Sequence, residues 1–302
     1  MSTEPVISVK GLTKQFKDVR ALDGLDMTVY AGDVYGFLGP NGSGKSTTIR
    51  ILLSLASANS GSVELFGESY PSGRYNILRR IGALVEKPDF YEYIDAYKQL
   101  ELLLRYSGHD VKRNRIMEVL DLVGLKDRAF SKIRTYSKGM KQRLGIAQAI
   151  VHDPDLIILD EPVSGLDPAG IRDIRNLVIH LNKDFKKTIV LSSHLLYEVE
   201  IIANRMIIIN KGKAVVEGNV KDLLNSFEVR TVIKTNDDDM SINILKESGI
   251  NLTGLESGAD GIVFHCKRES IPFVNQCLVA KGLMVESIHQ VQSLEDYFMN
   301  LT

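Results

Sequence analysis

The strongest constraint on the fold of this chain is a glycine-rich loop between an apolar run and a predicted helix. Residues 39–47 read GPNGSGKST, which fits the pattern G-x-x-x-x-G-K-[ST], and the apolar run Val34–Leu38 precedes them. Glycines let the backbone curl so that N–H groups point inward, and a helix starting near Gly44 adds its positive end. A turn that binds nothing would need neither the lysine nor the Ser/Thr pair at these offsets. The loop is therefore interpreted as a phosphate-binding site.

Each residue type in this loop has a predicted task. Lys45 is expected to reach the β- and γ-phosphates of a nucleotide, and the Ser46 hydroxyl is expected to hold Mg²⁺. The predicted nucleotide-binding residues of the loop are Gly39, Asn41, Gly42, Ser43, Gly44, Lys45, Ser46 and Thr47.

Composition sets wider bounds. The 302 residues are 44% apolar and 25% charged, which is typical of a globular protein of roughly two domains. A net charge of -1 gives no electrostatic reason to bind nucleic acid. No apolar run approaches the ~18 residues that cross a bilayer, and residues 1–10 lack the layout of a secretory signal. Cys266 and Cys277 have no metal-ligand spacing, so a reducing cytoplasm is expected.

The order of predicted elements indicates an α/β fold. Alternation at Ile7–Lys10 and Leu25–Val29 predicts an N-terminal antiparallel β-subdomain. Strands and helices then alternate, which predicts a mainly parallel sheet with both faces covered. Candidate strands lie at Val34–Leu38, Ile81–Val85, Leu156–Leu159, Thr188–Ser192 and Arg205–Ile209. Helices are predicted at Gly44–Leu55, Pro168–Asn182 and Leu195–Ala203, and an inserted helical subdomain at about 86–150.

The character of the chain changes near residue 221. The remaining pattern predicts the order β-α-β-β-α-β, which is typical of a small ferredoxin-like α+β domain. Two domains are therefore expected, a nucleotide-binding domain at 1–220 and an accessory domain at 221–302.

Two consecutive acids follow a second buried strand. Residues 156–161 read LIILDE, so Asp160 stands at the carboxyl end of the strand, where it can hold Mg²⁺. Glu161 comes next, where it can polarise water for in-line attack on a γ-phosphate. An exposed Asp-Glu pair that merely begins a loop is the alternative, and the phosphate-binding loop argues against it.

A third motif is typical of one protein family. Residues 136–143 read YSKGMKQR and precede an apolar helix face; Ser137 is a good N-cap, and Gly139 allows close approach of a ligand. Together with the two earlier motifs, this string resembles the signature of the ATP-binding cassette (ABC) ATPase family, LSGGQ, with Lys138 for the first Gly and Met140 for Gln. The resemblance spans roughly residues 6–220 and implies the P-loop NTPase fold.

The resemblance assigns further residues. Ser164, Gly165, Leu166 and Asp167 match the family D-loop, which contacts a second subunit, and His194 matches the catalytic switch histidine. Ser137 and Gly139 would contact nucleotide, and Phe16 stands where the family places an aromatic that stacks on adenine. Apart from the resemblance, an aromatic at a strand end more often belongs to the core, so this is the alternative for Phe16.

One position departs from the family pattern. Glu86 stands where the family usually has a Gln that ligates Mg²⁺, and a carboxylate could still ligate the metal while adding a charge. A solvated glutamate is the alternative. This Glu, the pair Phe90-Tyr91 after it and the string YSKGMKQR together resemble the exporter branch that protects against bacitracin and lantibiotics. Residues 293–298, SLEDYF, also resemble tails of drug-exporter ATPase subunits.

The resemblance implies a working assembly. ATP and Mg²⁺ would lie between the phosphate-binding loop of one copy and the signature helix of another, so a homodimer is expected. It would dock on separate membrane-spanning permease subunits at the cytoplasmic face of the membrane, through the helical insert, and would not bind nucleic acid. Two alternatives remain: a non-transport ABC ATPase, although no sustained heptads separate Lys45 from Ser137, and a binding-only regulatory module.

Overall fold

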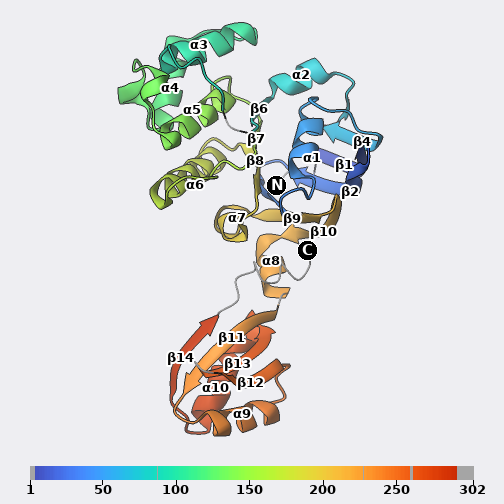
Figure 1. Ribbon diagram of the computed structural model, residues 1–302, viewed down its shortest axis with the longest axis vertical. Helices are drawn as coiled ribbons and strands as arrows, with labels where there is room; N and C mark the ends of the chain where they lie inside the picture. Colours follow the sequence, from blue (N-terminus) through green and yellow to red (C-terminus); the bar gives the residue numbers. More distant parts are fainter. Residues whose placement is uncertain (1–3, 87, 227, 259–260, 291–302) are drawn as a thin grey trace. The chain divides into compact units, whose positions relative to one another are not determined.

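The computed structural model describes residues 4–86, 88–226, 228–258 and 261–290 (Figure 1). The chain divides into two compact units, Met1–Glu217 and Gly218–Thr302, whereas the sequence placed the boundary after residue 220. Glu217 still belongs to the first unit because its carboxylate accepts hydrogen bonds from the Tyr35 hydroxyl, at 2.8 Å, and the Thr28 N–H, at 3.0 Å.

The first unit contains a six-stranded sheet in the order β10-β9-β3-β8-β7-β6. Its strands are β3 (Val34–Leu38), β6 (Ile81–Leu84), β7 (Leu156–Leu159), β8 (Thr188–Ser193), β9 (Arg205–Asn210) and β10 (Lys213–Asn219). From β9 to β6, all neighbours pair in parallel, which confirms the predicted mainly parallel sheet. β3, β7 and β8 are buried along their whole length, because both faces of the sheet are covered.

Four helices accompany this sheet, and Figure 1 shows α1 on one side of β7 and β8 and α6 on the other. They are α1 (Lys45–Leu52), α2 (Arg74–Arg79), α6 (Pro168–Lys183) and α7 (Leu196–Ile202). α1 ends at Leu52 and not at the predicted Leu55. Ser54 has a φ of 60°, a left-handed conformation that cannot continue a right-handed helix.

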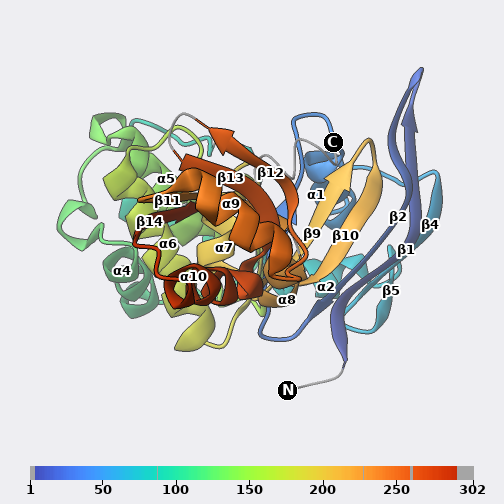
Figure 2. The same cartoon turned by 90° about the horizontal axis from the view of Figure 1, so that it is seen from below.

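A second, antiparallel sheet lies near the N-terminus, where the sequence predicts a β-subdomain. Its order is β2-β1-β4-β5, with β1 (Pro5–Phe16), β2 (Val19–Tyr30), β4 (Ser60–Leu65) and β5 (Glu68–Tyr70). Figure 2 shows β1 and β2 as a long twisted ribbon beside β4 and β5. Buried side chains of this sheet, such as Leu12 and Leu25, share one core with Ile49 and Leu52 of α1 and Phe37 of β3. The sheet is thereby held against the phosphate-binding loop region.

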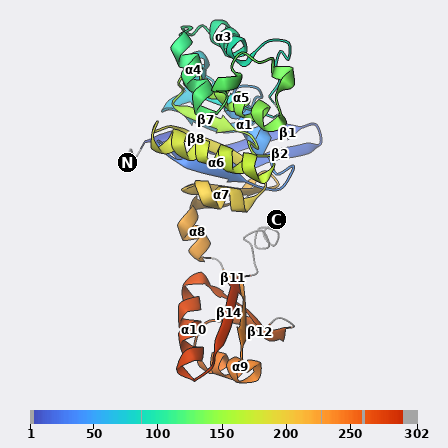
Figure 3. The same cartoon turned by 90° about the vertical axis from the view of Figure 1, so that its left-hand side faces the viewer.

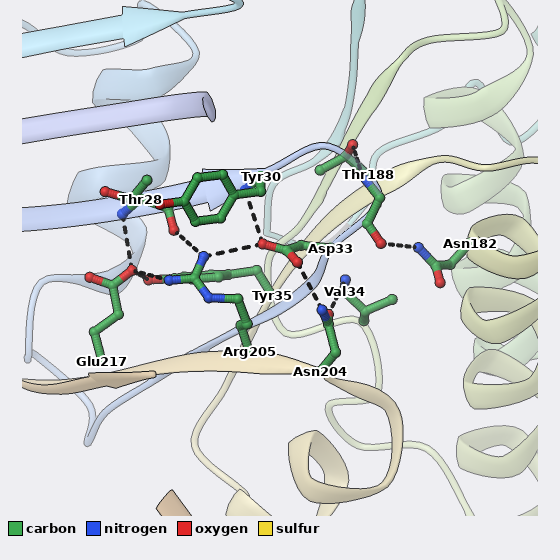
Figure 4. A network of polar contacts seen from close by, with 11 residues as sticks. Thr28, Tyr30, Asp33, Val34, Tyr35, Asn182, Thr188, Asn204, Arg205 and Glu217 are labelled. Atoms are coloured by element: carbon green, nitrogen blue, oxygen red, sulfur yellow. Dashed lines mark hydrogen bonds and ion pairs between the residues drawn. The ribbon is translucent and has the colours of Figure 1, made fainter. Parts of the chain in front are cut away.

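A polar network joins the two sheets (Figure 4). The Arg205 guanidinium on β9 donates to the Thr28 carbonyl on β2 at 2.8 Å. It also pairs with the carboxylates of Asp33, at 3.2 Å, and Glu217, at 3.3 Å. The side chains of Arg205 and Asp33 are 17% and 8% exposed, so the ion pair lies largely inside the protein. Leaving one of these charges without its partner would be costly.

Between β6 and β7, where the sequence predicts a helical insert, the chain is helical. Figure 3 shows its three helices grouped together: α3 (Ala96–Tyr106), α4 (Arg113–Leu122) and α5 (Lys138–Ile150). Two 3₁₀ turns, η1 (Lys126–Arg128) and η2 (Ile133–Thr135), connect α4 to α5. The apolar faces of the three helices meet through four fully buried side chains, Leu100 of α3, Ile116 and Val119 of α4, and Leu144 of α5.

The second unit follows the predicted order β-α-β-β-α-β after a leading helix, α8 (Val220–Ser226). Its elements are β11 (Glu228–Thr235), α9 (Asp238–Glu247), β12 (Thr253–Gly258), β13 (Gly261–Lys267), η3 (Arg268–Ser270), α10 (Ile271–Ala280) and β14 (Val285–Gln290). The strands form one antiparallel sheet in the order β12-β13-β11-β14. Ile233, Ile262 and Phe264 of the sheet pack with Leu245 and Leu278 of the helices as a separate core. The segment 293–298 lies outside the described residues.

Candidate functional site

The phosphate-binding loop connects the end of β3 to the start of α1. Gly44 has a φ of 113°, and a Cβ there would lie 2.7 Å from the Ala21 carbonyl oxygen, so only glycine fits. A Cβ on Gly39 would lie 2.5 Å from the Ile209 carbonyl oxygen. The loop is thus packed between β2 and β9, and its backbone has no room for side chains at these two positions.

Lys45 folds back over the loop. Its side chain is 5% exposed, and its ammonium donates to the carbonyl oxygens of Gly39, at 2.6 Å, and Pro40, at 3.1 Å. Burial lowers the pKa of Lys45, while the nearby charges of Glu161 and Asp160 raise it. A polyanion bound in the loop would supply the compensating charge that the burial of this lysine calls for.

The Ser43 hydroxyl is a second sign of a ligand in the phosphate-binding loop. It is 1% exposed, and its hydroxyl has no hydrogen-bond partner among the described residues. Buried polar groups are normally hydrogen-bonded, so an orphaned hydroxyl in a loop of this shape fits a phosphate oxygen. Ser46 and Thr47 lie in the first turn of α1 and are half-buried. The first N–H groups of a helix have no partner within it and can donate to the same ligand.

The two predicted acids follow β7. Asp160 is 4% exposed, its N–H donates to the Leu84 carbonyl at 2.7 Å, and its carboxylate accepts from the Ser192 hydroxyl. The same hydroxyl accepts from the Glu161 N–H at 2.9 Å. Ser192 therefore fixes both acids. It was not predicted as a site residue, and the only signal for it is its place at the end of the buried strand that precedes His194.

The structure brings Glu161 and His194 together. Nδ1 of His194 lies 3.3 Å from Oε1 of Glu161, and the two side chains are 42% and 30% exposed. Glu161 has a φ of 47°, a left-handed conformation that is uncommon for residues other than glycine and that turns the chain sharply after β7. The two predicted catalytic side chains are thus neighbours at a solvent-accessible edge of the sheet.

Glu86 lies two residues after the end of β6, with a φ of 63°. Its carboxylate pairs with the guanidinium of Arg50 on α1, and the two side chains are 61% and 44% exposed. Neither the positive φ nor this partner was predicted from the sequence.

Phe16 ends β1 and is 47% exposed, and the Lys14 ammonium lies 4.7 Å from its ring centre. Its ring is not part of the core.

The signature string and the D-loop lie together, away from the phosphate-binding loop. Ser137 is the N-cap of α5 and accepts from the Met140 N–H at 3.2 Å, which confirms the predicted cap. Asp167 caps α6 and accepts from the Gly170 N–H at 2.9 Å. Both segments line one surface cavity of about 430 Å³, which has no phosphate-binding-loop residue in its lining. Its lining residues are Ser137, Lys138, Gly139, Arg143, Gly165, Leu166, Asp167, Ala169, Gly170 and Asp173.

Ser164 and Gly165 complete the D-loop. The Ser164 N–H donates to the Glu161 carbonyl at 3.1 Å, so the D-loop is attached directly to the residue that carries a predicted catalytic carboxylate. A Cβ on Gly165 would lie 2.0 Å from the Lys138 ammonium, which covers this glycine. Lys138 of the signature string and the D-loop are therefore in contact within one chain.

A further support of the loop was not predicted. The Gly212 N–H, in the tight turn between β9 and β10, donates to the Ser43 carbonyl at 2.9 Å, and the Gly212 carbonyl accepts from the Asp23 N–H at 3.0 Å. Such contacts join segments far apart in the sequence, so no local pattern reveals them. They hold the loop between two hairpins.

Known proteins resemble this chain over most of its length. The family described as ABC transporter matches residues 22–164. An uncharacterized ABC transporter ATP-binding protein of Bacillus subtilis, YhcH, is 37% identical over 98% of this chain and 96% of its own length. The bacitracin transport ATP-binding protein BcrA of Bacillus licheniformis is 39% identical over 100% of this chain and 98% of its own. The chain belongs to the ABC transporter ATP-binding proteins.

Solved ABC cassettes share the fold of the first unit. The dimeric bacterial ABC transporter cassette MJ0796 superposes with a TM-score of 0.65 at 26% identity and covers 71% of this chain and 98% of its own. Its post-hydrolysis state bound to ADP and Pi superposes with a TM-score of 0.64 at 25% identity. As a member of this family, the chain is an ATP-binding subunit of an ABC transporter and an ATP hydrolase. Within the described residues, helices are too short or too polar to cross a membrane.

Proposed function

We propose that two copies of this chain close around two ATP molecules and so drive an exporter. The observation that carries this proposal is the separation of the site into two parts within one chain. Lys45 and Ser43 lie in the phosphate-binding loop, whereas Ser137 and Gly139 line a different cavity with the D-loop. A second copy can bring its Ser137 and the N-terminus of its α5 to the γ-phosphate held by the first. Ser164, Gly165, Leu166 and Asp167 would then contact that second copy.

Mg²⁺ fits the oxygen ligands beside the loop. Ser46 and Asp160 would hold the ion, with Glu86 as a third ligand, because Mg²⁺ prefers hydroxyl and carboxylate oxygens. Asp160 is buried and already oriented by Ser192, so its carboxylate is placed without further ordering. The ion, when bound, neutralises charge on the phosphate oxygens of ATP.

The remaining residues would bind nucleotide and orient water. The Lys45 ammonium would bind the β- and γ-phosphates through its positive charge. Backbone N–H groups would donate to the same phosphates from Gly39, Asn41, Gly42, Ser43, Gly44, Ser46 and Thr47. Phe16 stacks on the adenine ring with its exposed face. Glu161 orients the attacking water, and His194, 3.3 Å from it, holds that carboxylate toward the nucleotide.

A separate permease is the proposed membrane partner. An apolar groove of about 450 Å³ lies between α2, β6, α3 and α5, where the helical insert meets the parallel sheet. Tyr75 on α2 lines it and is 67% exposed, and Leu78 and Leu103 also belong to its lining. An exposed aromatic over apolar neighbours is suited to receive a short amphipathic segment of the permease. The ATPase would thus sit on the cytoplasmic face of the cell membrane.

Antibiotic, peptide or another drug-like compound is the proposed cargo. Two relatives, from Bacillus licheniformis and Enterococcus faecalis, are named bacitracin transport ATP-binding proteins and are 39% and 35% identical to this chain.

The second unit is proposed as a ferredoxin-like accessory domain, since its strand order β12-β13-β11-β14 and its two covering helices fit that arrangement. It would support dimer contacts or regulation.

Purification from membranes tests this function against its alternatives. The tagged chain should co-purify with a membrane-spanning protein, and Tyr75→Asp should lose that partner while still binding ATP. Tyr106→Asp is the matched control, because Tyr106 is 82% exposed and lies outside the groove. Co-purification with ribosomes or DNA in place of a membrane protein would contradict the proposal. In cells that lack the gene, wild type but not Glu161→Gln should restore growth in bacitracin if the cargo is of this class.

A further inference from the structure

The ion pair between Arg50 and Glu86 joins two elements that flank the proposed Mg²⁺ position. Arg50 lies in the last turn of α1, four residues after Ser46. Residues four apart on a helix share a face, with Cβ atoms about 5–6 Å apart. The guanidinium therefore reaches the same side of α1 from which the Ser46 hydroxyl would hold the metal.

Glu86 approaches the same position from the sheet. β6 and β7 pair in parallel, and the Asp160 N–H donates to the Leu84 carbonyl at 2.7 Å. Glu86 follows Leu84 by two residues, and its φ of 63° turns the chain toward α1. Its carboxylate is thus within one short loop of Asp160, yet in this structure it bonds to Arg50. Among the described residues, Arg50 makes no other ion pair.

We propose that Arg50 is a positioning residue that holds Glu86 beside α1 and competes with Mg²⁺ for its carboxylate. This inference rests on the proposed metal role of Glu86. When Mg²⁺ and nucleotide bind, the ion pair opens and the Glu86 carboxylate becomes available to the ion. Because both side chains are exposed to solvent, the pair is weak enough to open in this way.

If Arg50 and Mg²⁺ compete for the Glu86 carboxylate, removing the charge of Arg50 should strengthen Mg²⁺ binding. Arg50→Gln should lower the Mg²⁺ concentration required for half-maximal nucleotide binding by about two- to fivefold, as expected for loss of an exposed ion pair. Arg50→Lys keeps the charge and should behave like wild type. The difference between wild type and Arg50→Gln should shrink at high ionic strength, since salt screens exposed charges. Lys126→Gln is the matched control, because it breaks an exposed pair with Asp121 in the helical insert.

The experiment uses the full chain and a non-hydrolysable ATP analogue. Free Mn²⁺, as a spectroscopic substitute for Mg²⁺, is followed by electron paramagnetic resonance during titration of the protein with the analogue. The decisive comparison is the double variant Arg50→Gln/Glu86→Gln, which should match Glu86→Gln alone. If Arg50→Gln shifts the titration equally with Glu or Gln at position 86, Arg50 acts as a general charge and the proposal is wrong.

Analogue binding measured with and without divalent metal tests the metal site separately from the role of Arg50. Wild type that binds the analogue equally well with and without divalent metal would contradict the metal site itself. Wild type that requires metal, with Arg50→Gln indistinguishable from it, would contradict only the positioning role. Melting curves of each variant show whether the fold is intact, and it should be, because Arg50 is exposed at the end of α1.

Discussion

At the scale of single residues, the site depends on a few buried polar groups. Lys45, Ser43 and Asp160 are each 5% exposed or less, although lysine and aspartate are rarely buried without a reason. Lys45 has only carbonyl oxygens as partners in its loop. This burial fits the proposed binding of ATP and Mg²⁺ at these residues.

Replacement of Lys45 tests that organisation. Lys45→Ala should weaken ATP binding by at least about tenfold, because a hydrogen bond to a charged group is worth ~1.5–3 kcal/mol. Equilibrium binding of a fluorescent ATP analogue measures the effect, with Lys126→Ala as a surface control. Affinity equal to that of wild type would show that the loop does not bind phosphate.

Tyr35 gives a pH-dependent prediction. It is fully buried and donates to the Glu217 carboxylate at 2.8 Å; burial, reinforced by that negative charge, raises the pKa of Tyr35 well above its usual value. Because the folded pKa lies above the unfolded one, the stability that Tyr35 contributes is present below pH ~10 and is lost as the pH rises further.

Comparison with Tyr35→Phe isolates this contribution. At pH 8 the variant should be less stable by about 1 kcal/mol, the net value of one hydrogen bond. The difference should narrow as the pH rises above ~10, since only the wild type loses a stabilising proton. Urea unfolding at several pH values measures it. A difference that does not change with pH would show that the hydroxyl does not titrate as described.

The proposed site residues were named from the sequence, whereas their hydrogen-bond and ion-pair partners were not. The residues of local motifs, such as Lys45, Asp160 and Glu161, carry their chemistry in their spacing. His194 was predicted from motif order, and it lies next to Glu161. Ser192, Gly212 and Arg50 could not be predicted, because their partners come from distant segments that only the fold brings together.

At the scale of elements, close backbone packing positions the signature helix. Gly82 in β6 lies against α5, where a Cβ would be 1.7 Å from the Ala149 carbonyl oxygen. This distance allows no side chain, and the obstacle is backbone, which cannot rotate away. Ala149 lies in the last turn of α5, so this contact fixes the C-terminal end of the helix whose N-cap is Ser137.

Gly82→Ala should therefore destabilise the protein by about 3 kcal/mol or more, because overpacking forces α5 away from the sheet. Gly139→Ala is the matched control: a Cβ there meets nothing within 4 Å, and alanine favours helix by ~1 kcal/mol. Thermal unfolding of both variants is the measurement. Equal melting temperatures for Gly82→Ala and wild type would contradict the described packing of β6 on α5.

Elements with regular patterns were predicted well, and short irregular ones were not. The buried strand β7 and the helix α6 follow their predicted ranges closely. β5 and α2, which are three and six residues long, were not predicted, nor were the mostly exposed strands β4 and β10, and α1 ends earlier than predicted. Such short elements bury few side chains, so their position depends on neighbours more than on periodicity.

At the scale of the whole molecule, the two units have separate apolar cores. The nucleotide motifs all lie in Met1–Glu217, and the core of the second unit contains Ile233, Phe264 and Leu278. The strand order within each sheet was not predictable, since it depends on pairings between distant segments. The division of the chain was nearly predictable, because composition and motif density both change there.

Truncation after Leu224 tests the independence of the first unit. The shortened protein should remain folded and bind ATP with an affinity close to that of the full chain, because no predicted nucleotide contact is removed. Its dimerisation should change if the second unit supports dimer contacts. A truncated protein with a normal circular dichroism spectrum and no ATP binding would show that the second unit contributes to the site.

In the proposed function, ATP closes two copies of this chain around Glu161. Glu161→Gln keeps the shape of the side chain but loses the charge that orients water, so ATP should persist in the closed dimer. Size-exclusion chromatography of the full-length variant with ATP and Mg²⁺ measures the result most directly. We expect an ATP-dependent dimer that the additional change Lys45→Ala abolishes. A variant that stays monomeric with ATP and hydrolyses it at the wild-type rate would contradict the account.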